Sequence, residues 1–447
     1  MGRMWHRFVG DAPLVWWRAK FTWLLAAVTL TTMAVGLSGS PAQARSSKST
    51  LTIATVAPFT GVDAVLGPKY ATACLAATQE INKVGGILGH QIKCKTVDTR
   101  GDPADAVPAV RQMYATTSNL AFVIGCTSDE ASTVVPIFGA NDTVSFCMTG
   151  ESEFDSVKFP YFFRLVPPDA ADAVAMVAIA QNKGFKKIAL AFGNDAGSQT
   201  FVQPALTAIG KAPGMSVVAN ETLDISATSF QTEAQNIVSA HPDAILMEAL
   251  GPAGIALLSE IYQLNGNKMI PVIGTSAMID PTFYAGVTAA VGVNNFITNF
   301  DADNAVAPAV TSAYPLFKKL VLAQAGKVRG VGNFSTLLSA NGTVHLYDGI
   351  NIAALAMVMS GSTKGSVYKK DILKIANGVP GATVVTSYAS GVKALKAHKK
   401  IRYEGVGGLY NFDAYHTSFG AFEDAQYTAT GGTVSVGTLS TAQLNKL

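Results

Sequence analysis

The sequence lacks the motifs of common enzyme classes. Only 14% of its 447 residues are charged and six are His. It has no Walker loop, no Gly-x-Ser-x-Gly and no His-x-x-x-His, and Gly405-x-Gly407-Gly408 lacks the spacing and following helix of a dinucleotide-binding loop. A hydrolase needs a nucleophile, a base and an orienting acid within reach of one another. We therefore expect no enzymatic activity, no cofactor and no metal site.

The first 44 residues differ from the rest of the chain. Four basic residues precede an uncharged apolar run of 17 residues, 21–37, which ends in small residues and an Ala-x-Ala segment. This order is typical of an export signal, with cleavage expected after Ala44. An uncleaved anchor is the alternative, because about 17–25 apolar residues span a bilayer. No Cys stands directly after the apolar run, where a lipid anchor would be attached, and no Arg-Arg pair precedes the run. We therefore expect general export without a lipid anchor.

The remaining chain has no excess of either charge. Residues 1–44 hold four of the 33 basic and one of the 30 acidic residues, which leaves 29 of each. A balanced chain offers no basic stripe to nucleic acid or anionic lipid. No second long apolar run follows, so we expect residues 45–447 to be soluble, with nucleic acid excluded as a partner.

Four cysteines follow the signal: Cys74, Cys94, Cys126 and Cys147. An even number in an exported protein predicts disulfides, and four cysteines allow three pairings. The first is expected on a helix and the second on the next strand, while the other two end consecutive strands. Proximity therefore favours Cys74–Cys94 and Cys126–Cys147. The spacings do not fit a zinc ribbon, and four buried thiols remain the alternative.

Short β-rich runs alternate with helical patterns. The run 51–57 indicates a strand, and apolar residues spaced by three or four then indicate a helix that stops at Gly85-Gly86. Four strands and three helices alternate by residue 150, and the alternation restarts after Pro167-Pro168. This predicts an α/β fold with two doubly wound parallel-sheet lobes, whose strand carboxyl ends face a shared cleft. Residues 391–400 are a candidate crossing between the lobes.

A series of segments, taken in order, resembles one known family. Most of them indicate structure, since Gly85, Gly86 and Gly89 permit a tight turn between a helix and a strand. The segments are Ala57–Gly61, Glu80–Gly89, Gly101–Pro103, Val123–Gly125, Phe162–Arg164, Asn194–Gly197, His241–Ala244, Val272–Thr275 and Tyr347-Asp348. They resemble the type I periplasmic solute-binding proteins of ABC importers, of the branched-chain amino-acid (Leu/Ile/Val)-binding kind.

The resemblance implies a Venus-flytrap architecture, in which a multi-strand hinge joins the two lobes. The expected first lobe comprises residues 50–167 and 301–395, and the second comprises 168–300 and 396–447. A small-molecule solute would close the lobes, and the closed form, a monomer in the periplasm or secreted, would dock on ABC permease subunits. A ligand-sensing receptor of the same fold and an exported structural protein are the alternatives.

In this family a hydroxyl after the third strand binds the ligand carboxylate. Here the corresponding loop contains Thr127 and Ser128, and backbone N–H groups at the following helix start could add to an anion site. Simple N-capping of that helix by Ser128 or Asp129 is an equally strong interpretation.

The next loop departs from the family. It contains Thr149, Gly150 and Glu151, and Gly150-Glu151 stands where amino-acid binders usually carry Ala-Thr. A carboxylate at this point would repel the carboxylate of the ligand. Either Glu151 points away from the site, or the ligand is not a plain amino acid.

The second lobe departs further from the family pattern. Ala196 and Leu250 stand in place of two aromatic residues, and Ser276 stands near the acidic residue that pairs with a ligand ammonium. Asp195 or Glu248 could substitute for that acid, although both also fit structural capping roles. A buried ammonium without an acidic or aromatic partner is costly. We therefore expect a ligand other than a leucine-like zwitterion, such as a carboxylate-bearing, aromatic or amide-type nutrient.

Overall fold

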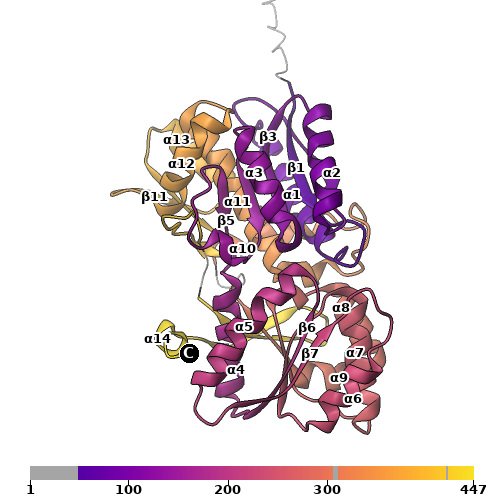
Figure 1. The fold of residues 1–447 in the computed structure, drawn as a ribbon. Helices are drawn as coiled ribbons and strands as arrows, with labels where there is room; N and C mark the ends of the chain where they lie inside the picture. Colours follow the sequence, from indigo (N-terminus) through magenta and orange to yellow (C-terminus); the bar gives the residue numbers. More distant parts are fainter. Residues whose placement is uncertain (1–48, 306–310, 419–420) are drawn as a thin grey trace, which may run out of the picture. The chain divides into compact units, whose positions relative to one another are not determined.

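The computed structural model describes residues 49–305, 311–418 and 421–447. The expected export signal and its cleavage point after Ala44 lie outside these residues. The predicted α/β class is confirmed: two sheets, each covered by helices on both faces, form two lobes (Figure 1). Within the described part of the chain, no helix has the length and apolar character needed to cross a membrane.

The first lobe is built on a five-stranded parallel sheet in the order β2-β1-β3-β4-β5. The chain runs outward from β1 to β2 and then returns to the other side of β1, so the strand order reverses between β1 and β3. Ligands of open α/β sheets bind at such a reversal, beyond the strand carboxyl ends. The strands are β1 (Leu51–Ala57), β2 (Ile92–Asp98), β3 (Leu120–Thr127), β4 (Ser145–Met148) and β5 (Phe162–Arg164).

Helices from two separate parts of the sequence cover this sheet. One face packs against α1 and α11, and the other packs against α2 and α3. Helix α11 is buried almost all round, because α1, α12 and α13 pack around it. The helices of the lobe are α1 (Leu66–Lys83), α2 (Pro103–Thr116), α3 (Ser128–Ala140), α10 (Tyr314–Leu322), α11 (Asn341–Ser360), α12 (Gly365–Asn377) and α13 (Tyr388–Lys396), with short 3-10 turns η1 (Ser152–Phe154) and η4 (Phe334–Leu338).

The second lobe repeats the doubly wound pattern and adds two antiparallel strands. Its order is β15-β14-β10-β9-β8-β6-β7, which reverses between β6 and β8. Only the pairs β10–β14 and β14–β15 are antiparallel, because β14 runs opposite to the other strands. The strands are β6 (Lys187–Gly193), β7 (Ser216–Leu223), β8 (Ala244–Glu248), β9 (Val272–Gly274), β10 (Phe300–Asn304), β14 (Glu423–Tyr427) and β15 (Thr433–Thr438).

Two helical layers enclose this second sheet. Helices α4, α5 and α14 lie on one face, and α6 to α9 lie on the other. The elements are α4 (Asp169–Asn182), α5 (Ala196–Lys211), α6 (Gln231–Ser239), α7 (Gly251–Leu264), α8 (Pro281–Val291), α9 (Val293–Asn299) and α14 (Thr441–Leu444), with the 3-10 turn η2 (Ser276–Met278).

The chain returns to the second lobe later than residue 396. A small sheet of β11 (Thr383–Val385), β12 (Ile401–Gly405) and β13 (Gly408–Leu409) packs on the first lobe, and residues as far as Phe412 belong to its core. The candidate crossing at 391–400 is occupied by α13 and the turn that follows it. Strand β10 belongs to the second sheet. Further on, His416 stacks on Phe163 of β5 and Thr417 pairs with Arg164. We therefore propose crossings after Asn304 and after Ser418, in place of residues 301 and 396.

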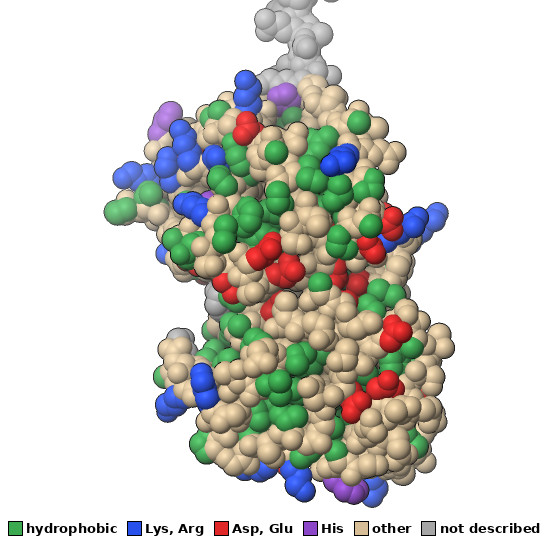
Figure 2. Space-filling view, viewed as in Figure 1, with side chains coloured by type: hydrophobic (Ala, Val, Ile, Leu, Met, Phe, Trp, Pro, Cys, Tyr) green, Lys and Arg blue, Asp and Glu red, His purple; other side chains and the backbone are tan. Residues whose placement is uncertain are grey.

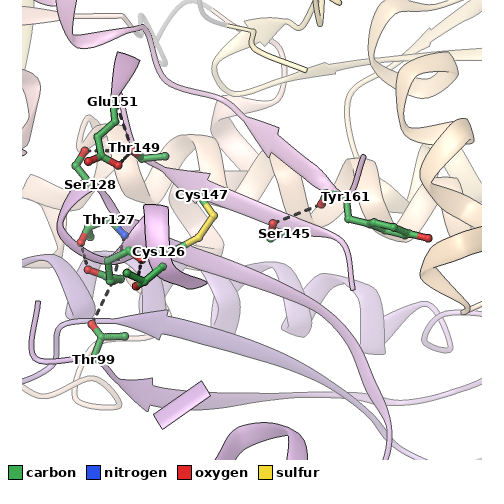
Figure 3. The surroundings of a disulfide bond; sticks show 11 residues. Thr99, Cys126, Thr127, Ser128, Ser145, Cys147, Thr149, Glu151 and Tyr161 are labelled. Carbon is green, nitrogen blue, oxygen red and sulfur yellow. Dashed lines mark hydrogen bonds between the residues drawn. A yellow bond between two sulfur atoms is a disulfide. The ribbon is translucent and has the colours of Figure 1, made fainter. Parts of the chain in front are cut away.

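Both disulfides lie in the first lobe. Cys74 on α1 is joined to Cys94 on β2, and Cys126 on β3 is joined to Cys147 on β4, which is the pairing expected from proximity. The second bond ties together the ends of two neighbouring strands, one residue before Thr127 and two residues before Thr149 (Figure 3). It therefore holds two loops at the carboxyl edge of the sheet in a fixed relation.

Candidate functional site

A cavity of about 100 Å³ lies between the two lobes, and acidic side chains gather near the narrowing between the lobes on the face that Figure 2 shows. Residues that follow β1, β3 and β4 line it from the first lobe, and residues that follow β6, β8 and β9 line it from the second. Both points at which the strand order reverses therefore face the same cavity, as expected for a ligand site in this kind of fold.

The structure brings six of the eight predicted ligand-binding residues to this cavity. Thr149 and Glu151 are not on its lining, although Thr149 lies behind Ser128 and accepts a hydrogen bond from the Ser128 hydroxyl at 3.3 Å. The six lining residues are Thr127, Ser128, Gly150, Asp195, Leu250 and Ser276.

The residue that caps helix α3 is Thr127, not Ser128 or Asp129. The Thr127 backbone N–H donates to Glu130 Oε1 at 3.1 Å, and its hydroxyl donates to Glu130 Oε2 at 2.5 Å. Thr127 and Glu130 also form a capping box, in which the Glu130 N–H points to the Thr127 side chain, so the Thr127 side chain is occupied. Ser128 is thereby left at the first helical position, on the cavity lining.

Glu151 contacts Thr149 instead of the cavity. The Thr149 hydroxyl lies 3.4 Å from Glu151 Oε2, and the Glu151 N–H donates back to Thr149 Oγ1 at 3.3 Å (Figure 3). Burial, and secondarily the nearby carboxyls of Glu153 and Asp169, raise the pKa of Glu151 to about 8. Of the two outcomes predicted for Glu151, the structure has the one in which it points away.

The second lobe presents two carboxyls that combine capping with cavity lining. Asp195 caps α5, since its Oδ1 accepts a hydrogen bond from the Ser198 N–H at 2.7 Å. Glu248 accepts hydrogen bonds from the Thr275 hydroxyl and, at 3.4 Å, from the Ser198 hydroxyl. Both residues nevertheless lie on the cavity lining, so their structural role does not remove them from the site.

Three residues of the first lobe, Lys69, Asn341 and Asp129, make polar contacts to the second lobe around the cavity. Lys69 of α1 donates to the Ala277 carbonyl at 2.8 Å and lies 3.5 Å from Asp280 Oδ2. Asn341 of α11 donates to Ser276 Oγ at 3.0 Å. The Gly197 N–H of α5, in the second lobe, donates to Asp129 Oδ1 of α3, in the first lobe, at 3.2 Å. The cavity walls are therefore held together by side chains from both lobes.

Sequence reasoning missed several lining residues, above all acids. Asp169 and Asp172 occupy the first turn of α4, and their i, i+3 spacing places them on one helix face. That spacing after Pro167-Pro168 was the available signal. Asp129 directly follows Ser128 and could have been included with it. Lys69 and Asn341 carry no local signal, because only the packing of α1 and α11 brings them to the cavity.

The fold and the cavity agree with the family comparison. A family model described as "Periplasmic binding protein" matches residues 50–325, which is more than half of the chain. The chain belongs to this family. This periplasmic binding protein is 28% identical over 278 residues to the Leu/Ile/Val-binding protein BraC3 of Rhizobium johnstonii, an alignment that covers 62% of the chain and 74% of the relative.

Solved structures show the same fold at lower identity. The LivJ substrate-binding protein of Streptococcus pneumoniae, in complex with isoleucine, gives a TM-score of 0.68 at 16% identity and covers 87% of this chain and 99% of its own. A solute-binding protein of an ABC transporter from R. palustris, in complex with benzoate, gives 0.67 at 17% identity and covers 87% and 96%. Such identities support the architecture alone.

Burial and repulsion from neighbouring carboxyls raise the pKa of four acids of this binding protein, Asp129, Asp169, Asp172 and Glu248, so these four stay protonated to higher pH than usual. Burial raises the pKa of Asp169 to about 7, against the opposing effects of the Thr200 hydroxyl and of Arg164. Burial likewise raises the pKa of Asp172, which faces Asp303, and of Glu248. Burial and the neighbouring Asp195 raise the pKa of Asp129. Protons therefore offset part of the crowded negative charge.

With Ser276 near the acidic position of the family, the sequence left Asp195 or Glu248 as substitute partners for an ammonium group, and both line the cavity of this periplasmic binding protein. The cavity collects carboxyls from four places in the chain. They follow β3, begin α4, follow β6 and end β8. The acids on the lining are Asp129, Asp169, Asp172, Asp195 and Glu248.

Proposed function

We propose that the protein is an exported receptor that captures a small solute between its lobes and delivers it to the membrane permease of an ABC importer. The signal pattern of residues 1–44 supports export to a periplasm or beyond the cell. Membership of the periplasmic binding protein family supports the transport role. The partners are then the solute and the permease subunits, and the receptor acts as a monomer without catalysis.

The observation that carries this proposal is the cavity lined from both lobes. A site built from two lobes forms fully only when they are together, so a solute that contacts both stabilises the closed arrangement. The contacts of Lys69, Asn341 and Asp129 across the cavity supply the closed arrangement with polar contacts of its own.

We also propose that the solute is not a leucine-like amino acid. The hydroxyl of Ser128, the candidate partner of a ligand carboxylate, already donates to Thr149 Oγ1, and Ser128 stands beside Asp129 on the lining. An α-carboxylate placed at Ser128 would face the Asp129 carboxylate in a site with little water, where like charges repel strongly.

A thermal-shift screen of the refolded protein tests the receptor role. Refolding removes solute carried over from the expression host. A solute at about 100 times its dissociation constant adds about 2.7 kcal/mol to the free energy of unfolding and raises the melting midpoint. We expect one chemical class among amino acids, aromatic acids, amides, amines, diacids and sugars to do so, and leucine to have no effect.

Two variants on one helix give the control. Ser128→Ala is expected to lower the affinity for the identified solute several-fold, as measured by calorimetry. Ser132 is an exposed residue on α3, and Ser132→Ala should leave the affinity unchanged. A leucine-induced shift would contradict the ligand proposal alone. The absence of any shift across the screen would contradict the receptor role and favour a structural protein.

A further inference from the structure

The charge of the cavity lining is one-sided. Five carboxyls line it, and Lys69 is the one basic residue among the described residues that do so. Lys69 is already engaged, since its Nζ binds the Ala277 carbonyl and lies 3.5 Å from Asp280. The lining therefore has no unengaged cation to offer to an anionic solute.

The backbone donors at the start of helix α5 are also occupied. Helix α5 begins at the cavity, and its N-terminal N–H groups would ordinarily attract a carboxylate. Here the Gly197 N–H donates to Asp129 Oδ1 at 3.2 Å, and the Ser198 N–H donates to Asp195 Oδ1 at 2.7 Å. The protein's own carboxylates thus take the positions that a ligand anion would need.

A further acceptor on the lining has no partner. Asn341 is only 7% exposed, and its Nδ2 donates to Ser276 Oγ at 3.0 Å. Its Oδ1 is buried and accepts no hydrogen bond. Leaving a buried acceptor unpaired costs about 1–3 kcal/mol, so a ligand donor at this point would be favoured.

The remaining lining is apolar and small. The side chains of Leu66, Tyr70, Met148, Phe201 and Leu250 contribute to it. With roughly 10–15 Å³ for each water-sized sphere, a cavity of about 100 Å³ holds roughly seven to ten water molecules. A solute of similar size has roughly ten or fewer non-hydrogen atoms, with an apolar body.

We infer that the solute is a small organic cation that carries N–H donors and no carboxylate: an amine or a guanidine. This inference rests on the proposed receptor function and names its solute class. The acids supply the counter-charge, which selects a cation, and Asn341 Oδ1 supplies an acceptor for a donor on that cation. A quaternary ammonium compound has no N–H and would leave Asn341 unpaired. No group of three or more His, Cys, Asp or Glu side chains within the described ranges is arranged to hold a metal ion.

Binding of such a cation is linked to release of protons. Asp169, whose pKa burial raises to about 7, and the carboxyls around it hold protons while the cavity is empty. A cation favours their ionised forms, so affinity rises as the pH passes upward through these pKa values. The charged and titratable groups that face these carboxyls are Asp63, Lys69, Tyr70, Glu130, Glu151, Asp155, Arg164 and Asp303.

The test is calorimetry on the refolded protein with putrescine, agmatine and benzylamine as cationic probes. Tetramethylammonium, leucine, benzoate and 1,4-butanediol are the comparison probes. We expect at least one N–H cation to bind, at least tenfold more tightly at pH 8.0 than at pH 5.5. The binding heat should differ between phosphate and Tris buffers in the direction of proton release. The comparison probes should not bind.

Glu248→Gln and Asp172→Asn should each lower the affinity for the cation at least tenfold. Either variant is a sufficient test if the other fails to fold. Glu233→Gln removes one negative charge from α6 of the same lobe, outside the cavity, and should leave the affinity unchanged. Failure of all three cations to bind, or binding that these cavity variants do not alter, overturns the inference. Binding of benzoate or leucine instead overturns the inference and leaves the receptor role intact. Only the absence of binding by every compound in the solute screen contradicts both the inference and the receptor role.

Discussion

Asp348→Ala is expected to lower the free energy of unfolding by about 4 kcal/mol or more. Asp348 lies in the middle of α11 and is fully buried. Its Oδ1 accepts from the Tyr403 hydroxyl at 2.9 Å and the Val406 N–H at 3.0 Å, and its Oδ2 accepts from the Gly407 N–H and the Tyr410 hydroxyl, both at 2.8 Å. Each buried donor left unpaired costs about 1–3 kcal/mol.

The loss should appear as a lower urea midpoint in circular dichroism. Asp348→Asn retains one acceptor and should fall between alanine and the wild type. Asp105→Ala removes an exposed carboxylate that lies 3.6 Å from Arg100, and a change within about 0.5 kcal/mol is expected there. A loss below about 1 kcal/mol for Asp348→Ala would show that the turn after β12 forms without this carboxylate.

Gly150→Ala is expected to abolish solute binding and to destabilise the protein by about 1–3 kcal/mol. An added Cβ at Gly150 would lie 1.7 Å from Asp169 Oδ1 and 2.8 Å from the Asp169 backbone nitrogen. The Asp169 N–H also donates to the Gly150 carbonyl at 2.9 Å, so the two backbones cannot separate without losing that bond. Overpacking of a tight site commonly has a cost of this size.

Gly139→Ala is the matched control, because a Cβ at that position in α3 meets nothing within 4 Å. Alanine there should be neutral or should stabilise the helix by up to about 1 kcal/mol. Melting midpoints and calorimetry on both variants give the comparison. In a double variant, Asp169→Ala should recover part of the stability lost by Gly150→Ala; strictly additive losses would argue against the predicted clash.

The sequence predicts the parts of this protein that depend on local patterns. Strand and helix alternation gave the α/β class, and neighbouring elements gave the disulfide pairs. The family resemblance placed the loop 127–128 at the site, which agrees with the rule that the carboxyl ends of parallel strands meet at one edge. Local patterns could not show that Thr127 takes the capping role, since Ser128 and Asp129 have equally suitable side chains.

The acidic character of the cavity needed the tertiary structure. Asp169, Asp195 and Glu248 stand far apart in the sequence, and each has a local role that explains it on its own. Only the packing of the two sheets brings them onto one lining. The late return of the chain was missed for a similar reason: the Lys-rich stretch before β12 resembles a linker, whereas Ile401 and Tyr403 beyond it are fully buried in the first lobe.

The uneven placement of the disulfides bears on how this protein can evolve. Both bonds lie in the first lobe and span 20 and 21 residues of sequence, and loops of this size stabilise a fold by about 3 kcal/mol each in the chain-entropy model. Most substitutions destabilise, and selection removes those that leave too little stability for function. The first lobe can therefore tolerate more costly changes on its side of the cavity, and we expect new solute specificities to arise there more readily than in the second lobe.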